Sequence, residues 1–162
     1  MNIGKYVWGC ALVVSSVAAA YLLGVFVADL YSSQQNNVFE TLDGEKVTLS
    51  NVVTGPSLIT FFAPDCYLCT EHLDNARVAV SDTSDYRRVV LISSSDRVDL
   101  QKAIGSYEIR FPILWDRDRL YSHRLNVVVE PLVIEIDEDM VIRQIVAGAL
   151  TTNEIREVFE GQ

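Results

Sequence analysis

The chain of 162 residues contains little cysteine, little histidine and little positive charge. It has three cysteines and two histidines, and its 13 lysines and arginines face 22 aspartates and glutamates. The formal net charge of −9 makes nucleic acids and anionic membrane surfaces poor partners, because both repel an acidic protein. We see no internal repeat, and the acidity itself indicates solubility.

Charge is absent altogether from residues 6–28. Lys5 and Asp29 bound 23 uncharged residues, which as a helix would extend about 34 Å, at about 1.5 Å per residue. That length exceeds the hydrocarbon core of a bilayer, which is about 30 Å thick. We therefore predict a cytoplasmic tail over residues 1–5, a transmembrane helix over 6–28 and a polar linker over 29–37.

The orientation of this helix follows from Lys5 and the terminal amine, because positive charge stays on the cytoplasmic side. The domain over 38–162 is then extracytoplasmic. A cleaved signal peptide is the alternative, since Ala18 and Ala20 have the spacing of a cleavage site. The apolar run continues over 21–28, past that site, and this favours an uncleaved anchor.

The cysteines divide into one isolated residue and one pair. Cys10 lies within the predicted membrane helix, where it acts as a small apolar residue. Cys66 and Cys69 follow the apolar run 57–62, and two thiols at this spacing on one helix face can form a disulfide. The first thiol meets the unpaired N–H groups of the helix start, which favour a thiolate.

A bridge with this spacing closes almost no loop and adds little stability, so a structural role for the pair is disfavoured. The pattern indicates a redox-active pair.

The rest of the sequence predicts one α/β domain over 38–162. Asp43 and Gly44 form the turn of a first hairpin, and two strand-then-helix units follow, which predicts parallel pairing. The expected strands are 38–42, 47–49, 57–62, 89–92, a short edge segment at 111–114, and a second hairpin of 132–136 with 141–147. The expected helices begin near 66 and 98 and cover 118–125 and 151–159.

Four stretches in this order resemble the membrane-anchored, thioredoxin-like TlpA/ResA group of thiol-disulfide oxidoreductases. They are residues 39–44 with 47–49, then 61–69, 111–116 and 129–137. The resemblance implies a thioredoxin-like fold, with a mixed central sheet flanked by helices and an N-terminal hairpin. It also implies a single-pass protein of a bacterial inner membrane, with its domain in the periplasm.

The resemblance also implies the roles of three residues. Cys66 is the attacking thiol, Cys69 is the more shielded resolving thiol, and Pro131 is a cis proline beside Cys66 that helps to hold an extended substrate segment. The redox-active disulfide is then the sole cofactor expected. The expected partners are thiols or disulfides of a client protein and a membrane electron donor or acceptor.

Two carboxylates depart from the family pattern. Asp65 stands where thioredoxins carry tryptophan, and Glu130 precedes Pro131. Negative charge near Cys66 opposes thiolate formation, which suggests a reductase-leaning pair. The resemblance implies that the clients of such a pair are proteins in cytochrome c maturation or metalloenzyme maturation.

Proton handling also departs from the pattern. Thr60 stands at the position of the buried acid of thioredoxins, and His72 stands where the TlpA-like group often has glutamate. One hypothesis makes His72 the proton acceptor for Cys69, one helical turn away. The alternative, which the usual exposure of histidine favours, is a surface residue.

Other functions remain open at this point. Two thiolates with a histidine could bind copper in a metallochaperone, with His123 the second histidine, although copper-binding relatives typically have three residues between the cysteines. A MauD-like role in forming disulfides in one dedicated client fits the same residues. A scaffold without chemistry is disfavoured, because both cysteines and the proline are present.

Overall fold

The computed structural model describes residues 38–53, 55–81 and 85–160. In these three ranges no helix is both long and apolar enough to cross a membrane. The predicted tail, membrane helix and linker lie outside the described residues, and so does Cys10.

The first hairpin forms as predicted. Strand β1 (Val38–Thr41) pairs antiparallel with β2 (Lys46–Thr48). Gly44 in the turn has φ of +89°, a backbone conformation that residues with a Cβ atom rarely adopt. The short helix α2 (Leu49–Val52) follows directly and buries Leu49.

Two strand-then-helix units build the centre of the sheet. They are β3 (Ser57–Phe61) with α3 (Tyr67–Val80), and β4 (Val89–Ser93) with α4 (Arg97–Tyr107). Every residue of β3 and β4 is buried, and the two strands pair in parallel, as the order of elements predicted. A short 3₁₀ turn, η1 (Tyr86–Arg88), leads into β4.

The prediction that residues 111–114 form an edge segment is wrong. Strand β5 (Ile113–Trp115) lies inside the sheet, parallel to β4 on one side and antiparallel to β1 on the other. The N-terminal hairpin covers the free side of β5, so β2 becomes the edge instead. Pro112 is tolerated there because it precedes the strand, where its missing N–H leaves no gap in the ladder.

The C-terminal part completes the sheet. After α5 (Leu120–Arg124), strand β6 (Leu132–Ile136) pairs antiparallel with β3, and β7 (Ile142–Ala147) pairs antiparallel with β6. The closing helix α6 (Thr152–Glu160) forms where it was predicted, shifted by one residue from the expected range 151–159. The strand order is β2-β1-β5-β4-β3-β6-β7.

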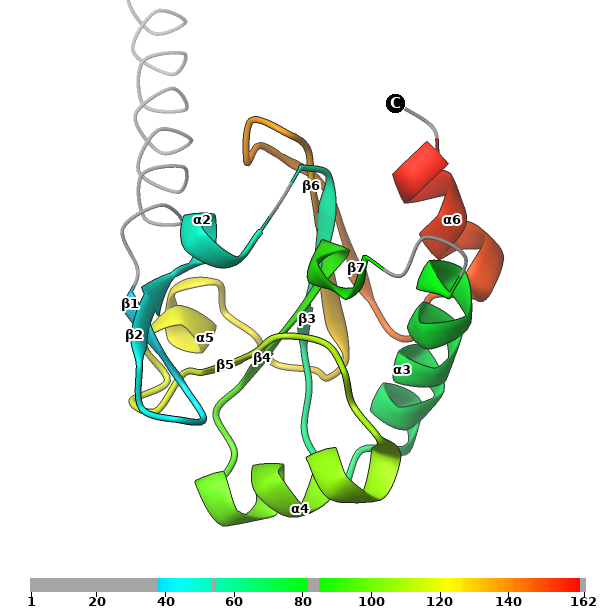
Figure 1. Cartoon of the computed structure of the whole chain (residues 1–162). Coiled ribbons are helices and arrows are strands. Elements are labelled where there is room, and N and C mark those ends of the chain that lie inside the picture. The colour runs from blue at the N-terminus through cyan, green and yellow to red at the C-terminus, as the bar shows by residue number, and fades with distance from the viewer. Residues whose placement is uncertain (1–37, 54, 82–84, 161–162) are drawn as a thin grey trace, which may run out of the picture. The chain divides into compact units, whose positions relative to one another are not determined.

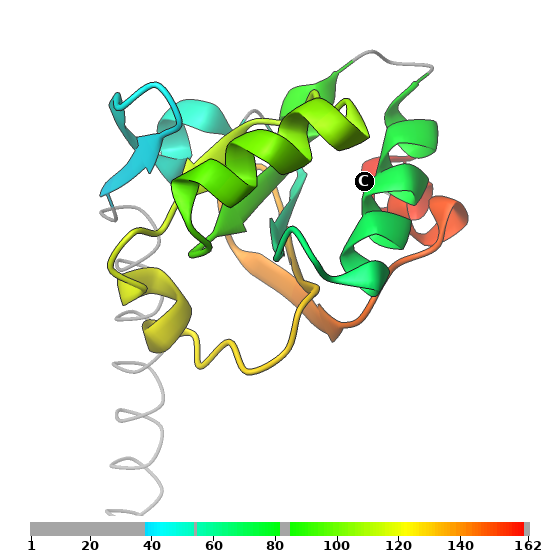
Figure 2. The same ribbon diagram turned by 90° about the horizontal axis from the view of Figure 1, so that it is seen from below.

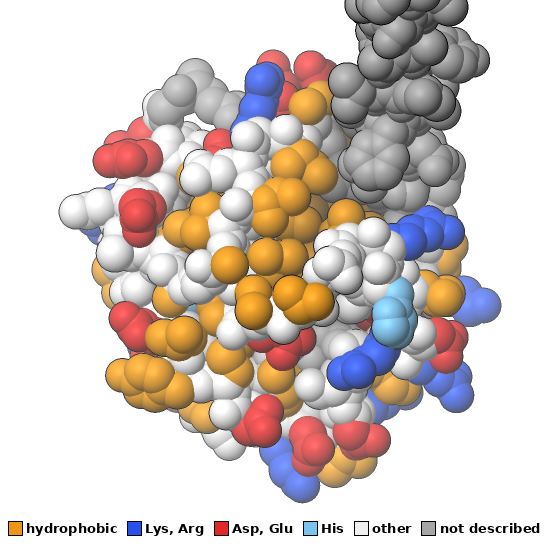
Figure 3. Space-filling model, turned by 180° about the vertical axis from the view of Figure 1, so that it is seen from behind, with side chains coloured by type: hydrophobic (Ala, Val, Ile, Leu, Met, Phe, Trp, Pro, Cys, Tyr) orange, Lys and Arg blue, Asp and Glu red, His pale blue; other side chains and the backbone are white. Residues whose placement is uncertain are grey.

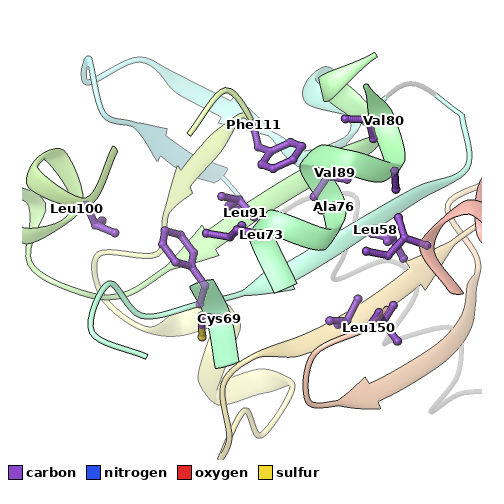
Figure 4. Close-up of a cluster of buried hydrophobic side chains, with 14 residues drawn as sticks. Leu58, Cys69, Leu73, Ala76, Val80, Val89, Leu91, Leu100, Phe111 and Leu150 are labelled. Carbon is purple, nitrogen blue, oxygen red and sulfur yellow. The ribbon is translucent and has the colours of Figure 1, made fainter. Parts of the chain in front are cut away.

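The sheet has a hydrophobic cluster on each face, because successive side chains of a strand point to opposite sides. Leu58 of β3 packs with residues of α3, α4 and α6, whereas Ile59 packs with residues of α2 and α5. The ribbon views show the same division, with α3 and α6 side by side and α2 and α5 across the strands from them (Figure 1, Figure 2). The first cluster includes Cys69 and Leu150 (Figure 4).

Candidate active site

Cys66 and Cys69 form a disulfide at the start of α3, with their Cα atoms 5.2 Å apart. Cys66 is the N-cap residue, and its Sγ accepts a hydrogen bond of 3.1 Å from the N–H of Cys69. Cys66 is partly exposed, whereas Cys69 is only 1% exposed. An incoming sulfur therefore meets Cys66 first, and the N–H group aimed at its Sγ would stabilise a thiolate there.

Pro131 lies where the resemblance predicted. The Glu130–Pro131 peptide bond is cis, and the carbonyl oxygen of Glu130 is 3.4 Å from the Sγ of Cys66. A disulfide sulfur carries no proton, so this is a contact and not a hydrogen bond in the oxidised protein. The contact joins the loop before β6 to the start of α3, across 64 residues of sequence.

The carboxylates predicted near Cys66 share one electrostatic environment. Burial raises the pKa of the Glu130 carboxyl above its usual 4.5, Arg119 opposes that shift, and Asp65 adds to it. Asp65 is exposed beside Cys66. The surface around the Cys66 sulfur therefore carries negative charge, which Arg119 partly compensates.

Arg119 is a residue that the sequence analysis missed. It is the N-cap residue of α5, with φ of +56°, and its Nε donates to the Ser94 hydroxyl at 3.2 Å. Together with His123 and Glu130 it lines a groove of about 340 Å³. No local pattern marked it, because Arg119 comes near Glu130 only through the fold.

Apolar side chains are exposed near the disulfide. Tyr67, in the first turn of α3, is 80% exposed, and Leu68 beside it is 47% exposed. Val128 and Val129, which precede Glu130, are exposed as well. Hydrophobic side chains also gather on the face turned away from the viewer of Figure 1 (Figure 3). Apolar surface of this kind is suited to contact with a partner protein.

The interpretation of His72 as a surface residue is wrong, because its side chain is fully buried. Its Nε2 lies 3.0 Å from the Thr60 hydroxyl, and its Nδ1 accepts a hydrogen bond of 3.2 Å from the Leu150 N–H. Burial lowers the pKa of His72 from 6.5 to about 4. The position that holds a buried acid in thioredoxins is thus part of an uncharged Thr60–His72 pair.

The copper hypothesis finds no assembled set of ligands in the described part of the chain. No group of three or more His, Cys, Asp or Glu side chains there is placed to hold a metal ion. His72 has both ring nitrogens engaged, and His123 is exposed in the groove beside Glu130.

The fold and the site together define a thioredoxin-like disulfide oxidoreductase. The mixed sheet, the C-x-x-C disulfide that begins α3 and the cis proline against Cys66 are its defining parts. A model of the AhpC/TSA family matches residues 32–145, so the chain belongs to that family.

Individual relatives agree with this assignment. The chain is 26% identical over 125 residues to the thioredoxin-like protein YneN of Bacillus subtilis, a match that covers 75% of this chain and 73% of that protein.

Two solved structures share the fold. A secreted Mycobacterium tuberculosis disulfide oxidoreductase, homologous to E. coli DsbE, is 19% identical with a TM-score of 0.68, and the match covers 80% of this chain and 98% of that one. StoA from Bacillus subtilis is 19% identical with a TM-score of 0.62, and the match covers 76% of this chain and 96% of StoA.

Proposed function

We propose that this protein is a membrane-anchored, extracytoplasmic thiol-disulfide oxidoreductase of the TlpA/ResA type that reduces a client protein. In this proposal residues 6–28 hold it in a bacterial inner membrane as a single-pass protein. The uncharged run over 6–28 supports the anchor, and the secreted structural relative supports the compartment.

The observation that carries the proposal is the unequal exposure of the two sulfurs. In the reduced enzyme the Cys66 thiolate attacks one sulfur of the client disulfide, and the other client sulfur leaves as a thiolate. Cys69 then loses its proton and attacks the Sγ of Cys66, which releases the second client thiol. The enzyme ends as the Cys66–Cys69 disulfide, two electrons have passed to the client, and no other cofactor takes part.

Pro131 and its neighbours are proposed to hold the client during this exchange. The Glu130 carbonyl already contacts the Cys66 sulfur, so the backbone before β6 borders the path of an incoming sulfur. An extended client segment could lie along this backbone while Tyr67 and Leu68 contact its apolar side chains.

The negative surface favours the reducing direction. A strong oxidant owes its potential to a stabilised thiolate in its reduced form. Asp65 and Glu130 destabilise a thiolate at Cys66 and thus make the reduced form a better electron donor. A membrane electron donor would restore the thiols, and cytochrome c maturation or metalloenzyme maturation would supply the client.

The exchange is tested by trapping the mixed disulfide. The full chain carrying Cys69→Ser is expressed in its native membrane, free thiols are blocked with acid and alkylating agent, and adducts are separated without reductant. A client should remain attached to Cys66 and be released by reductant. The matched control is Cys66→Ser, which should trap no client. Recovery of no adduct with Cys69→Ser, or of the same adduct with Cys66→Ser, refutes the proposal.

The direction is tested separately by measuring the Cys66 pKa and the redox state of the trapped client. A reductase leaves its client oxidised when the gene is deleted, whereas a factor for disulfide formation leaves the client reduced. A Cys66 pKa below about 5 would contradict the reducing direction, because it is typical of a strong oxidant.

A further inference from the structure

His72 has a bonding pattern that fixes its protonation state. The backbone N–H of Leu150 can only donate, so the Nδ1 that faces it at 3.2 Å must be an acceptor without a proton. A neutral imidazole then carries its single proton on Nε2, which donates to the Thr60 hydroxyl at 3.0 Å. Both ring nitrogens are therefore occupied.

The ring cannot take up a further proton without losing a bond. Nδ1 would have to release the Leu150 N–H, which would leave a buried donor without its partner. Burial also disfavours the charged ring and lowers the pKa of His72 to about 4. With that pKa, about one His72 ring in a thousand is charged at pH 7.

The acidic side chains of the neighbouring elements do not stabilise a charged His72 ring. On α3, Glu71 and Asp74 are exposed, and on α6 the carboxylate of Glu154 accepts hydrogen bonds from Thr151. On β3 the ring faces the uncharged Thr60.

His72 also belongs to a clamp on the segment between β7 and α6. It binds the N–H of Leu150, while Asn75, three residues further along α3, donates from Nδ2 to the carbonyl oxygen of Leu150 at 2.9 Å. The two residues lie on one face of the helix. The Leu150 side chain packs in the same cluster as Cys69 (Figure 4).

We propose that His72 is a positioning residue and not the proton acceptor of the exchange reaction. As a neutral ring it fixes α3 to Leu150 and keeps the interior beside Cys69 free of charge. The Cys69 thiol then loses its proton outward, to water or to the departing client thiolate. The proposal rests on the proposed function only in naming Cys69 as the resolving thiol.

The first test reads the tautomer directly. Long-range proton–nitrogen NMR spectra of the full chain, labelled with nitrogen-15 at histidine, are recorded from pH 5.5 to 8.5 in the oxidised and reduced states. The variant His123→Asn assigns the signals. His72 should keep the proton on Nε2 throughout, without titrating. A ring that titrates in this range in either redox state overturns the proposal.

The second test separates positioning from proton transfer. Reduced protein reacts with an aromatic disulfide reagent, and stopped-flow absorbance follows the second thiol that Cys69 releases. In His72→Asn the amide oxygen can still accept the Leu150 N–H but cannot take up a proton. The ratio of the wild-type rate constant to the variant rate constant should vary by less than about twofold between pH 5.5 and pH 8.5.

A proton acceptor at His72 would instead change that ratio about tenfold or more across the range. Such a result overturns the proposal, whereas a constant ratio supports it. The aromatic reagent reacts without a client protein. If the trapping experiment recovers no client but the aromatic thiol is released normally, the proposed exchange with a client is refuted and the proposal for His72 is not. The NMR measurement decides the state of His72 in either case.

Discussion

Acid should destabilise this protein through His72. The folded protein binds a proton at His72 with a pKa of about 4, against 6.5 for a solvated histidine. The unfolded chain therefore binds more protons between these values, and stability falls as the pH falls through this window. The contribution is fully present above about pH 6.5 and is lost progressively towards pH 4.

The size of the effect follows from the two pKa values. The full difference corresponds to about 3 kcal/mol, at about 1.4 kcal/mol per unit. Between pH 7 and pH 4.5 the free energy of unfolding should fall by about 2 kcal/mol through His72. This is less than the full difference, because at pH 4.5 the folded protein also begins to bind a proton at His72. That is a large share of the free energy of unfolding of an ordinary domain, about 5–15 kcal/mol.

The assay compares wild type with His72→Asn, so that other titrating groups cancel. Urea unfolding of the oxidised full chain, in detergent, is followed by circular dichroism at half-unit steps from pH 7 to pH 4.5. The excess stability of wild type over the variant should shrink by about 2 kcal/mol across this range. His123→Asn, which replaces the exposed histidine, should retain the wild-type dependence.

The reasoning is refuted if the difference between wild type and His72→Asn stays constant within about 0.5 kcal/mol. That result would mean that His72 binds protons equally well in both states, and so is neither buried nor held by Leu150 in solution.

Three further predictions concern the core, a turn and the reactive sulfur. Leu58→Ala should cost about 2–5 kcal/mol of unfolding free energy, measured with urea, because Leu58 is fully buried against α3. Asp137→Asn should reduce the free energy of unfolding at pH 7, and this loss should shrink as the pH falls below 3.8. The N–H of Val141 is the main cause that lowers the pKa of Asp137, so the benefit exists only while the carboxylate is charged. Glu130→Gln should lower the pKa of Cys66 by about half a unit to one unit, read from thiolate absorbance against pH. An unchanged or higher value would contradict the electrostatic account of the reducing direction.

Much of the fold could be predicted because its determinants are local. Alternating or continuous apolar runs predicted β3, β4 and the second hairpin, and Asp43 with Gly44 predicted the first turn. The start of α4 was predicted near residue 98, and Asp96 caps this helix by accepting a hydrogen bond from the Val98 N–H.

The position of β5 could not be predicted in the same way. The three residues of β5 follow a proline and so resemble a strand at the edge of a sheet. Whether another strand pairs with β5 depends on a hairpin more than 60 residues earlier in the chain. Pairing between distant strands leaves no periodicity in either of them.

The sequence by itself determined the reactive pair, the order of strands and helices and the uncharged run at the N-terminus. These features depend on spacing, turn residues and charge within a few residues of one another. The tertiary structure alone decided that Glu130 contacts Cys66 and that Leu150, 78 residues further along, occupies a nitrogen of His72. Burial and hydrogen-bond partners belong to the packed chain, so the chemical state of His72 appears only after folding.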